Sequence, residues 1–76
     1  MNNNVDVLKS KVKYFFDSQI PVHVTYQRGY WKNGKIKEIG TDFFLIDEFL
    51  EGERVVFLLE IEDIVEYKSP EEVRNA

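Results

Sequence analysis

The spacing of apolar residues changes once along the chain, at Pro21. Before this proline, apolar side chains recur at steps of three and four, which places them on one helical face. These residues are Val5, Leu8, Val12, Phe15 and Phe16. After it, apolar residues alternate with polar ones or form short blocks divided by glycines, as strands do. The pattern predicts a helix over 4–18 and a β region over 22–67.

The predicted helix has a start and a stop in the sequence. The asparagines before Val5 offer side chains that cap free backbone N–H groups, and Asp6 suits the positive end of the helix dipole. The helix is expected to end before Ile20–Pro21, because the residue before a proline avoids the α region. Its apolar face is then expected to cover the open end of the β region.

Turn residues divide the β region into five short strands. They are expected over 22–27, 30–39, 42–49, 54–60 and 64–67. Arg28–Gly29 and Asn33–Gly34 compete for the first turn. We favour the turn at Arg28–Gly29 and a bend or bulge at Gly34, since a small barrel needs a strongly bent strand. The later breaks are expected at Gly40–Thr41, Leu50–Glu53 and Glu62–Asp63.

Strands this short predict a mainly β fold: an N-terminal helix followed by a five-stranded, strongly bent antiparallel barrel. Its expected core contains Val24, Tyr26, Ile36, Ile39, Leu45, Phe57 and Ile64. The run 55–59 is apolar at every position, whereas a strand with one wet face alternates. Its second face is therefore expected to meet the helix or a second subunit, because an apolar edge strand invites aggregation. We expect a homo-oligomer whose interface includes Val55, Val56, Phe57, Leu58 and Leu59.

The composition indicates one domain, 1–76, with no linker and with a charged tail over 69–76. There is no cysteine, hence no disulfide and no thiolate metal site. The formal net charge of -4 argues against non-specific binding to nucleic acid. No apolar stretch suits a membrane span, and the first residues lack a secretory signal, so a cytoplasmic protein is expected.

The order of one helix and five short strands resembles the Sm-like fold, in particular its bacterial Hfq branch. The resemblance rests on Val22-x-Val24-x-Tyr26-x-x-Gly29-x-x-x-x-Gly34-x-Ile36-x-x-Ile39, on the block Phe43–Ile46, and on Phe57, Ile61 and Ile64–Val65. An SH3-like barrel of another lineage has similar spacing. The resemblance implies a ring of identical subunits, in which the fourth strand pairs with the fifth strand of a neighbour. The implied interface adds Ile64, Val65 and Tyr67.

The resemblance also implies RNA binding, although the family's RNA-contacting residues do not carry over. Sm proteins have an Asp after the second strand and a polar residue in the third, where this chain has Gly40 and Phe44. The Arg-Gly or Lys-His pair near the end of the fourth strand falls on Leu58–Leu59. The usual uridine pocket around the pore is therefore expected to be missing.

A basic and aromatic cluster around the first turns is the remaining candidate site. It consists of Arg28, Tyr30, Trp31, Lys32, Lys35 and Lys37. Cations beside stacking aromatics are typical of proteins that bind single-stranded nucleic acid. The alternative is a solvated hairpin rim, with Trp31 packed against the helix or a neighbour.

Catalysis, cofactors and metals are not expected. His23 is the only histidine, and the sequence places no partner ligands for a transition metal. The carboxylates of 47–53 and 60–66 are expected to lie in water. No catalytic motif is present. We expect either a ring that binds RNA or single-stranded DNA, or a self-assembling scaffold that binds protein partners and no nucleic acid.

Overall fold

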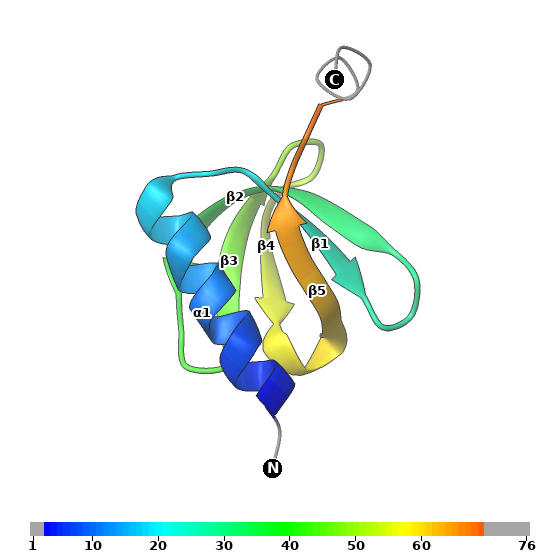
Figure 1. Ribbon diagram of the computed structural model, residues 1–76. Coiled ribbons are helices and arrows are strands. Elements are labelled where there is room, and N and C mark those ends of the chain that lie inside the picture. Colours follow the sequence, from blue (N-terminus) through cyan, green and yellow to red (C-terminus); the bar gives the residue numbers. More distant parts are fainter. Residues whose placement is uncertain (1–2, 70–76) are drawn as a thin grey trace.

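A computed structural model describes residues 3–69, which form one α-helix, five strands and one short 3-10 helix. The elements are α1 (Asn3–Ser18), β1 (Val22–Tyr26), β2 (Trp31–Ile39), β3 (Phe43–Glu48), β4 (Gly52–Phe57), η1 (Leu58–Glu60) and β5 (Ile61–Glu66). The mainly β fold with an N-terminal helix is confirmed (Figure 1). Apart from Ser69, the charged tail predicted over 69–76 lies outside the described residues.

Helix α1 presents an apolar face to the sheet and stops where the sequence predicts. Leu8 and Val12 are buried in the core. Beyond the last turn, Gln19 has φ 57°, and the backbone N–H of Ile20 donates to the carbonyl oxygen of Phe15 at 3.0 Å. A residue in the left-handed conformation, followed by an N–H that bonds to a carbonyl five residues earlier, forms a Schellman motif. The motif provides hydrogen-bond donors for the last carbonyl groups of the helix.

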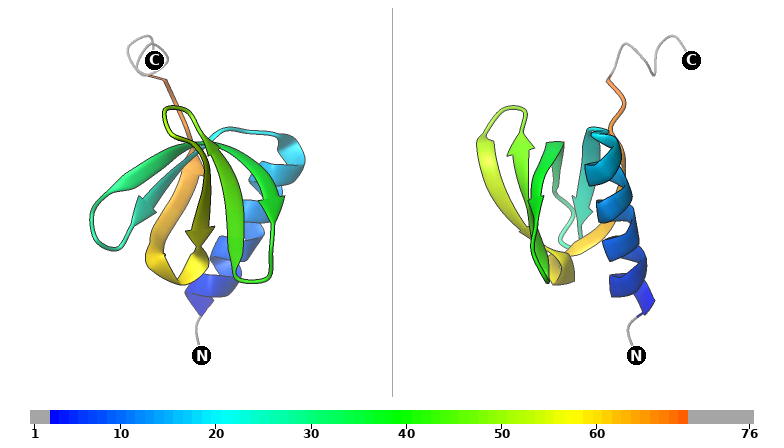
Figure 2. Two further views of the ribbon diagram at one scale, coloured as in Figure 1. Left: turned by 180° about the vertical axis from the view of Figure 1, so that it is seen from behind. Right: turned by 90° about the vertical axis from the view of Figure 1, so that its left-hand side faces the viewer.

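The strands form one antiparallel sheet in the order β4-β3-β2-β1-β5. The sheet is strongly bent, but within the described residues it leaves β4 and β5 as its two edges, so one chain does not close a barrel. Figure 1 projects these two strands beside each other, whereas the side view in Figure 2 separates them. In that view β5 lies beside α1, and the β3–β4 hairpin leans away from the helix.

The first turn lies at Arg28–Gly29, as predicted. Gly29 has φ 97°, and its N–H donates to the carbonyl oxygen of Tyr26 at 3.0 Å. Of the bend or bulge predicted at Gly34, the bulge lies elsewhere, because the register between β2 and β3 shifts between Ile36 and Glu38. Gly34 instead allows β2 to lie close to β3, since a Cβ at this position would collide with the carbonyl oxygen of Asp47.

The fourth strand is shorter than predicted. It ends at Phe57, and residues 58–60 form η1, which turns the corner expected at Glu62–Asp63. Leu58 points into the core and is 4% exposed, while Leu59 is 67% exposed. The apolar run predicts a continuous strand, but Leu58 and Leu59 belong to a turn that buries only Leu58.

The predicted core is partly correct. Val24, Tyr26, Ile36 and Ile64 are buried. Ile39 and Phe57 are 39% and 47% exposed, and Leu45 is half-buried, so their assignment to the core is wrong. The inward positions of β3 and β4 belong to Phe44, Ile46 and Val56, all fully buried. An uninterrupted apolar run gives no alternation from which the inward residues can be identified.

Candidate nucleic-acid interface

Trp31 stands on the outward face of the first hairpin. Its side chain is 61% exposed, and it pairs across the strands with Thr25. It lines an open hollow of about 830 Å³. The other lining residues are His23, Asn33, Val65, Glu66, Tyr67 and Lys68. The hollow therefore brings together the exposed indole of Trp31, the rings of His23 and Tyr67, and the cationic side chain of Lys68.

A cross-strand pair, His23 and Asn33, contributes polar groups to this hollow. His23 lies opposite Asn33 in the ladder, and His23 Nδ1 is 2.5 Å from Asn33 Oδ1. The second nitrogen of the imidazole is a hydrogen-bonding group in either tautomer. The hollow thus offers an aromatic platform together with a hydrogen-bonding ring nitrogen.

Tyr30 and Lys32 lie on the opposite face of the hairpin from Trp31. The Tyr30 ring stacks on Tyr26 with centroids 4.6 Å apart, and Lys32 Nζ lies 5.9 Å from the Tyr26 centroid. Burial, aided by the nearby Tyr30, raises the pKa of the Tyr26 hydroxyl to about 12. Tyr26 is therefore neutral at physiological pH, and Tyr30 is the half-exposed member of the stack.

The structure does not bring all six candidate residues onto one surface. Strand alternation separates Trp31 and Lys35 from Tyr30 and Lys32. Lys32 pairs with Glu51 at 3.4 Å, and Lys37 pairs with Glu53 at 2.9 Å, which raises the pKa of Lys37. Arg28 and Lys35 are exposed, without an ion pair among residues 3–69.

The residues predicted at a subunit interface differ in how far one chain buries them. Val56, Leu58 and Ile64 are buried in the chain's own core. The exposed side chains are those of Val55 (48% exposed), Phe57 (47%), Leu59 (67%) and Val65 (44%). Tyr67 is half-buried, and its ring meets Phe49 edge-on at 5.2 Å. The exposed members sit on the two edge strands or on η1 between them.

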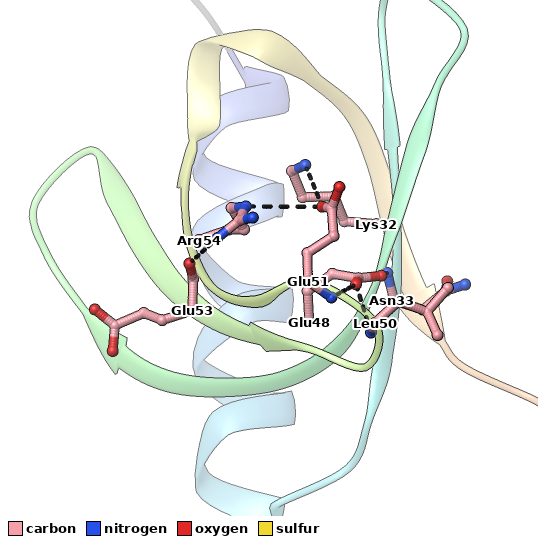
Figure 3. Close-up of polar contacts among 7 residues, drawn as sticks. All are labelled: Lys32, Asn33, Glu48, Leu50, Glu51, Glu53 and Arg54. Atoms are coloured by element: carbon pink, nitrogen blue, oxygen red, sulfur yellow. Dashed lines mark hydrogen bonds and ion pairs between the residues drawn. The ribbon is translucent and has the colours of Figure 1, made fainter.

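Glu48 has a structural role that the sequence reasoning missed. Its side chain is 9% exposed, and Oε1 accepts the backbone N–H groups of Leu50 and Glu51, both at 2.8 Å (Figure 3). Oε2 accepts the N–H of Asn33 at 3.2 Å. The bond from Leu50, with smaller help from Glu51 and Asn33, holds the pKa of Glu48 below its ordinary value despite burial.

The expectation of a carboxylate in water is therefore wrong for Glu48. It shares a strand face with the buried Phe44 and Ile46, but the unbroken apolar run before it does not show which face of β3 is inward, so the sequence carried no clear signal. Beside it, Glu51 contacts Lys32 and lies 3.8 Å from Arg54 Nε (Figure 3). The tight turn between β3 and β4 is thus fixed by a carboxylate below it and an ionic network beside it.

The four positions at which the resemblance implies RNA-contacting residues are Gly40, Phe44, Leu58 and Leu59, and they carry apolar or small groups. Phe44 is fully buried and Leu58 nearly so, while Leu59 is exposed. Gly40 packs under the ring of Phe43. Within residues 3–69, no three metal-ligating side chains gather in one place. None of the helices described has the length and apolar character needed to cross a membrane.

The open, strongly bent sheet with its N-terminal helix defines the fold as Sm-like. The 1.55 Å crystal structure of "the pleiotropic translational regulator, Hfq" matches with a TM-score of 0.68 and 15% identity. The match covers 78% of this chain and 97% of that one. No family model and no curated protein sequence matches the chain. The Sm-like fold expected from the sequence is therefore confirmed, and at this identity the likeness concerns the fold.

Proposed function

We propose that the chain forms a homo-oligomeric ring and binds single-stranded nucleic acid, RNA in the first place, on the face that carries Trp31. The observation that carries the proposal is an Sm-like sheet left open at two edges, with exposed apolar side chains on both. An unpaired sheet edge and an exposed apolar surface both promote aggregation of a monomer. A strand from a second subunit pairs the edge and covers the apolar side chains.

The nucleic-acid part of the proposal rests on Trp31 and its surroundings. An indole that is 61% exposed beside His23, Tyr67 and Lys68 offers stacking and a nearby cation. Stacking on an aromatic is tolerant of base identity and contributes about 1–3 kcal/mol per base. Lys35, which has no ion pair within residues 3–69, lies on the same strand face as Trp31 and supplies a further phosphate contact.

Fluorescence anisotropy with labelled single-stranded RNA and DNA, at low and high salt, tests the proposal. Binding that weakens with salt is expected, because phosphate contacts release counterions. Light scattering on the same sample gives the mass of the assembly. No anisotropy change with micromolar protein at low salt would end the nucleic-acid part, and a monomer mass would end the ring.

A second candidate is a self-assembling scaffold that binds protein partners and no nucleic acid. It is favoured by the net charge of -4 and by Leu50, which is 94% exposed on the rigid β3–β4 turn. A pull-down whose bound material is mainly RNA, and is lost after nuclease treatment, would count against it. Neither role requires catalysis or a cofactor, and a cytoplasmic location stays a prediction for both.

A further inference from the structure

A groove lies between helix α1 and the connection from β2 to β3, which passes beside the helix (Figure 1). Its volume is about 380 Å³, and it shares no lining residue with the hollow beside Trp31. One wall is a single face of α1, formed by residues at steps of three and four between Lys9 and Asp17. The opposite wall comes from residues between Ile39 and Phe43. The groove is therefore a second candidate site, which the nucleic-acid proposal does not use.

The inner surface of this groove is apolar and partly open to solvent. Val12 and Leu58 line it and are buried in the core, and Phe16 packs against the same core. Ile39, by contrast, is an exposed lining residue, although the sequence predicts it in the core. Its exposure gives the groove an apolar wall that a ligand can reach from solvent.

The charged residues that line the groove all belong to α1, and they are Lys9, Lys13 and Asp17. Lys13 Nζ lies 2.8 Å from Asp17 Oδ2, so these two charges largely offset each other. Lys9, one turn earlier on the same face, has no ion pair within residues 3–69. Two lysines and one aspartate give the groove a formal charge of +1, in a chain whose net charge is -4. An anion therefore suits this groove better than a cation does.

We propose that this groove binds the anion of a medium-chain fatty acid, with its alkyl chain along the apolar wall and its carboxylate beside Lys9. Pockets for small molecules are typically ~300–1,000 Å³ in volume and mostly apolar, with a few polar groups that fix the orientation of the ligand. The volume of about 380 Å³ lies near the lower limit, which suits one alkyl chain better than the two chains of a phospholipid. The ammonium group of Lys9 donates a charge-assisted hydrogen bond to the carboxylate.

A fatty acid also suits the scarcity of free backbone groups in the groove. A bound peptide carries backbone N–H groups, each of which needs an acceptor when it leaves water. In the connection from β2 to β3, the N–H of Gly40 already donates to the carbonyl oxygen of Phe43 at 2.8 Å. The carbonyl oxygen of Asp42 accepts the N–H of Leu58 at 2.9 Å. An alkyl chain needs no such partners, so an apolar wall with one nearby cation fits it better than it fits a peptide.

Isothermal titration calorimetry with decanoate tests the proposal, at concentrations below those that form micelles. Decanoate is compared with hexanoate and with decyltrimethylammonium, which has the same alkyl chain and the opposite charge. Decanoate is expected to bind more than about tenfold more tightly than hexanoate, because each buried methylene adds up to about fourfold in affinity. It is also expected to bind more tightly than the cation, although the net charge of -4 favours the cation. In NMR spectra, binding should shift the amide signal of Gly40 and leave the indole signal of Trp31 unchanged.

Variants of the groove locate the binding site. Ile39→Asp is expected to weaken decanoate binding by about tenfold or more, because it removes apolar surface and repels the ligand. Val7→Asp is the matched control, since Val7 is 54% exposed on α1 and does not line the groove. Circular dichroism checks that both variants are folded. Lys9→Gln should remove the preference for decanoate over decyltrimethylammonium.

Three results would overturn the proposal. The first is no binding of decanoate at millimolar concentration, or binding no tighter than that of decyltrimethylammonium. The second is an equal loss of affinity in Ile39→Asp and Val7→Asp, which would place the bound decanoate outside the groove. The third is a fall in the mass of the assembly in Ile39→Asp alone, measured by light scattering, which would show that a second copy of the chain covers the groove.

Discussion

Lys11 Nζ lies 2.7 Å from Asp63 Oδ1, and this ion pair ties α1 to β5. The same oxygen of Asp63 accepts the backbone N–H of Ile64 at 2.8 Å. Lys11, with a smaller contribution from the Ile64 bond, holds the pKa of Asp63 below its ordinary value. Both side chains are partly exposed, at 38% and 48%, so solvent screens the pair.

Asp63→Asn is expected to lower the free energy of unfolding at neutral pH by about 0.2–1 kcal/mol, the range of solvent-screened pairs. Because the pKa of Asp63 is lower in the folded chain, its contribution is complete above the unfolded pKa and is lost as pH falls through the folded one. Urea titrations at neutral and acid pH measure this. The gap between parent and variant should close in acid, and a gap that widens there contradicts the assignment. Glu62→Gln, at an exposed neighbouring site, is the control.

Glu48→Gln is expected to destabilise the fold by about 1–3 kcal/mol, the cost of an unsatisfied buried donor. The amide oxygen retains the bonds from Leu50 and Glu51, but the new NH₂ group then faces the N–H of Asn33. Chemical denaturation measures the loss, with Glu53→Gln on the exposed side of the same turn as control. Equal midpoints for the two variants would show that the buried carboxylate is not needed.

Gly34→Ala is expected to destabilise the chain by about 1–3 kcal/mol or more, as overpacking does. Its new methyl group meets the carbonyl of Asp47 and the backbone of Glu48, which cannot move without distorting β3. Gly40→Ala is the comparison, because its methyl group meets the ring of Phe43, a side chain that can turn aside. Thermal unfolding should rank Gly34→Ala as the less stable of the two, and the reverse order would argue against the close strand approach.

Trp31→Ala is expected to weaken binding of single-stranded RNA by about 1–3 kcal/mol without changing the mass of the assembly. Tyr30→Ala tests the other face of the hairpin and should have the smaller effect, because one face of its ring is already covered by Tyr26. Anisotropy titrations compare the two variants with the parent. A larger loss in Tyr30→Ala would move the binding face to the side of Lys32.

Phe57→Asp is expected to dissociate the assembly while leaving the chain folded. Phe57 is 47% exposed in one subunit, so a charge there is hydrated until a partner strand buries it. Light scattering should give a mass near the 9.0 kDa of the chain, and circular dichroism should stay that of the parent. Leu50→Asp, at a site 94% exposed, is the control. A variant of parent mass would place the interface elsewhere.

Local signals were enough to predict the order of the elements. The step-three and step-four spacing before Pro21 gave the helix, and the turn residues gave the strands to within a few positions. Arg28–Gly29 was correctly preferred over Asn33–Gly34, because only a bent and continuous β2 pairs with both β1 and β3. These features depend on residues that are close together in the sequence, so the sequence alone is enough to predict them.

The remaining features depend on contacts between segments far apart in the chain. The blocks Phe43–Ile46 and Val55–Leu59 are apolar on both sides, so their alternation does not show which side is the core. The burial of Glu48 likewise depends on which face of β3 packs against the core. The division of Tyr30 from Trp31, in contrast, follows from strand alternation, which the sequence contains. The candidate site is predicted as one set of residues although alternation already divides them between two faces, and the structure shows that the hollow lies on the face of Trp31.

The register shift in β2 between Ile36 and Glu38 has an effect beyond the single chain. It helps to set the direction in which β3 and β4 leave the strands beside the helix. In a ring joined edge to edge, the angle between the two edges of one protomer determines how many copies complete the circle. In the proposed ring, the curvature of this central strand therefore acts together with the contacts between protomers to set the diameter of the central hole.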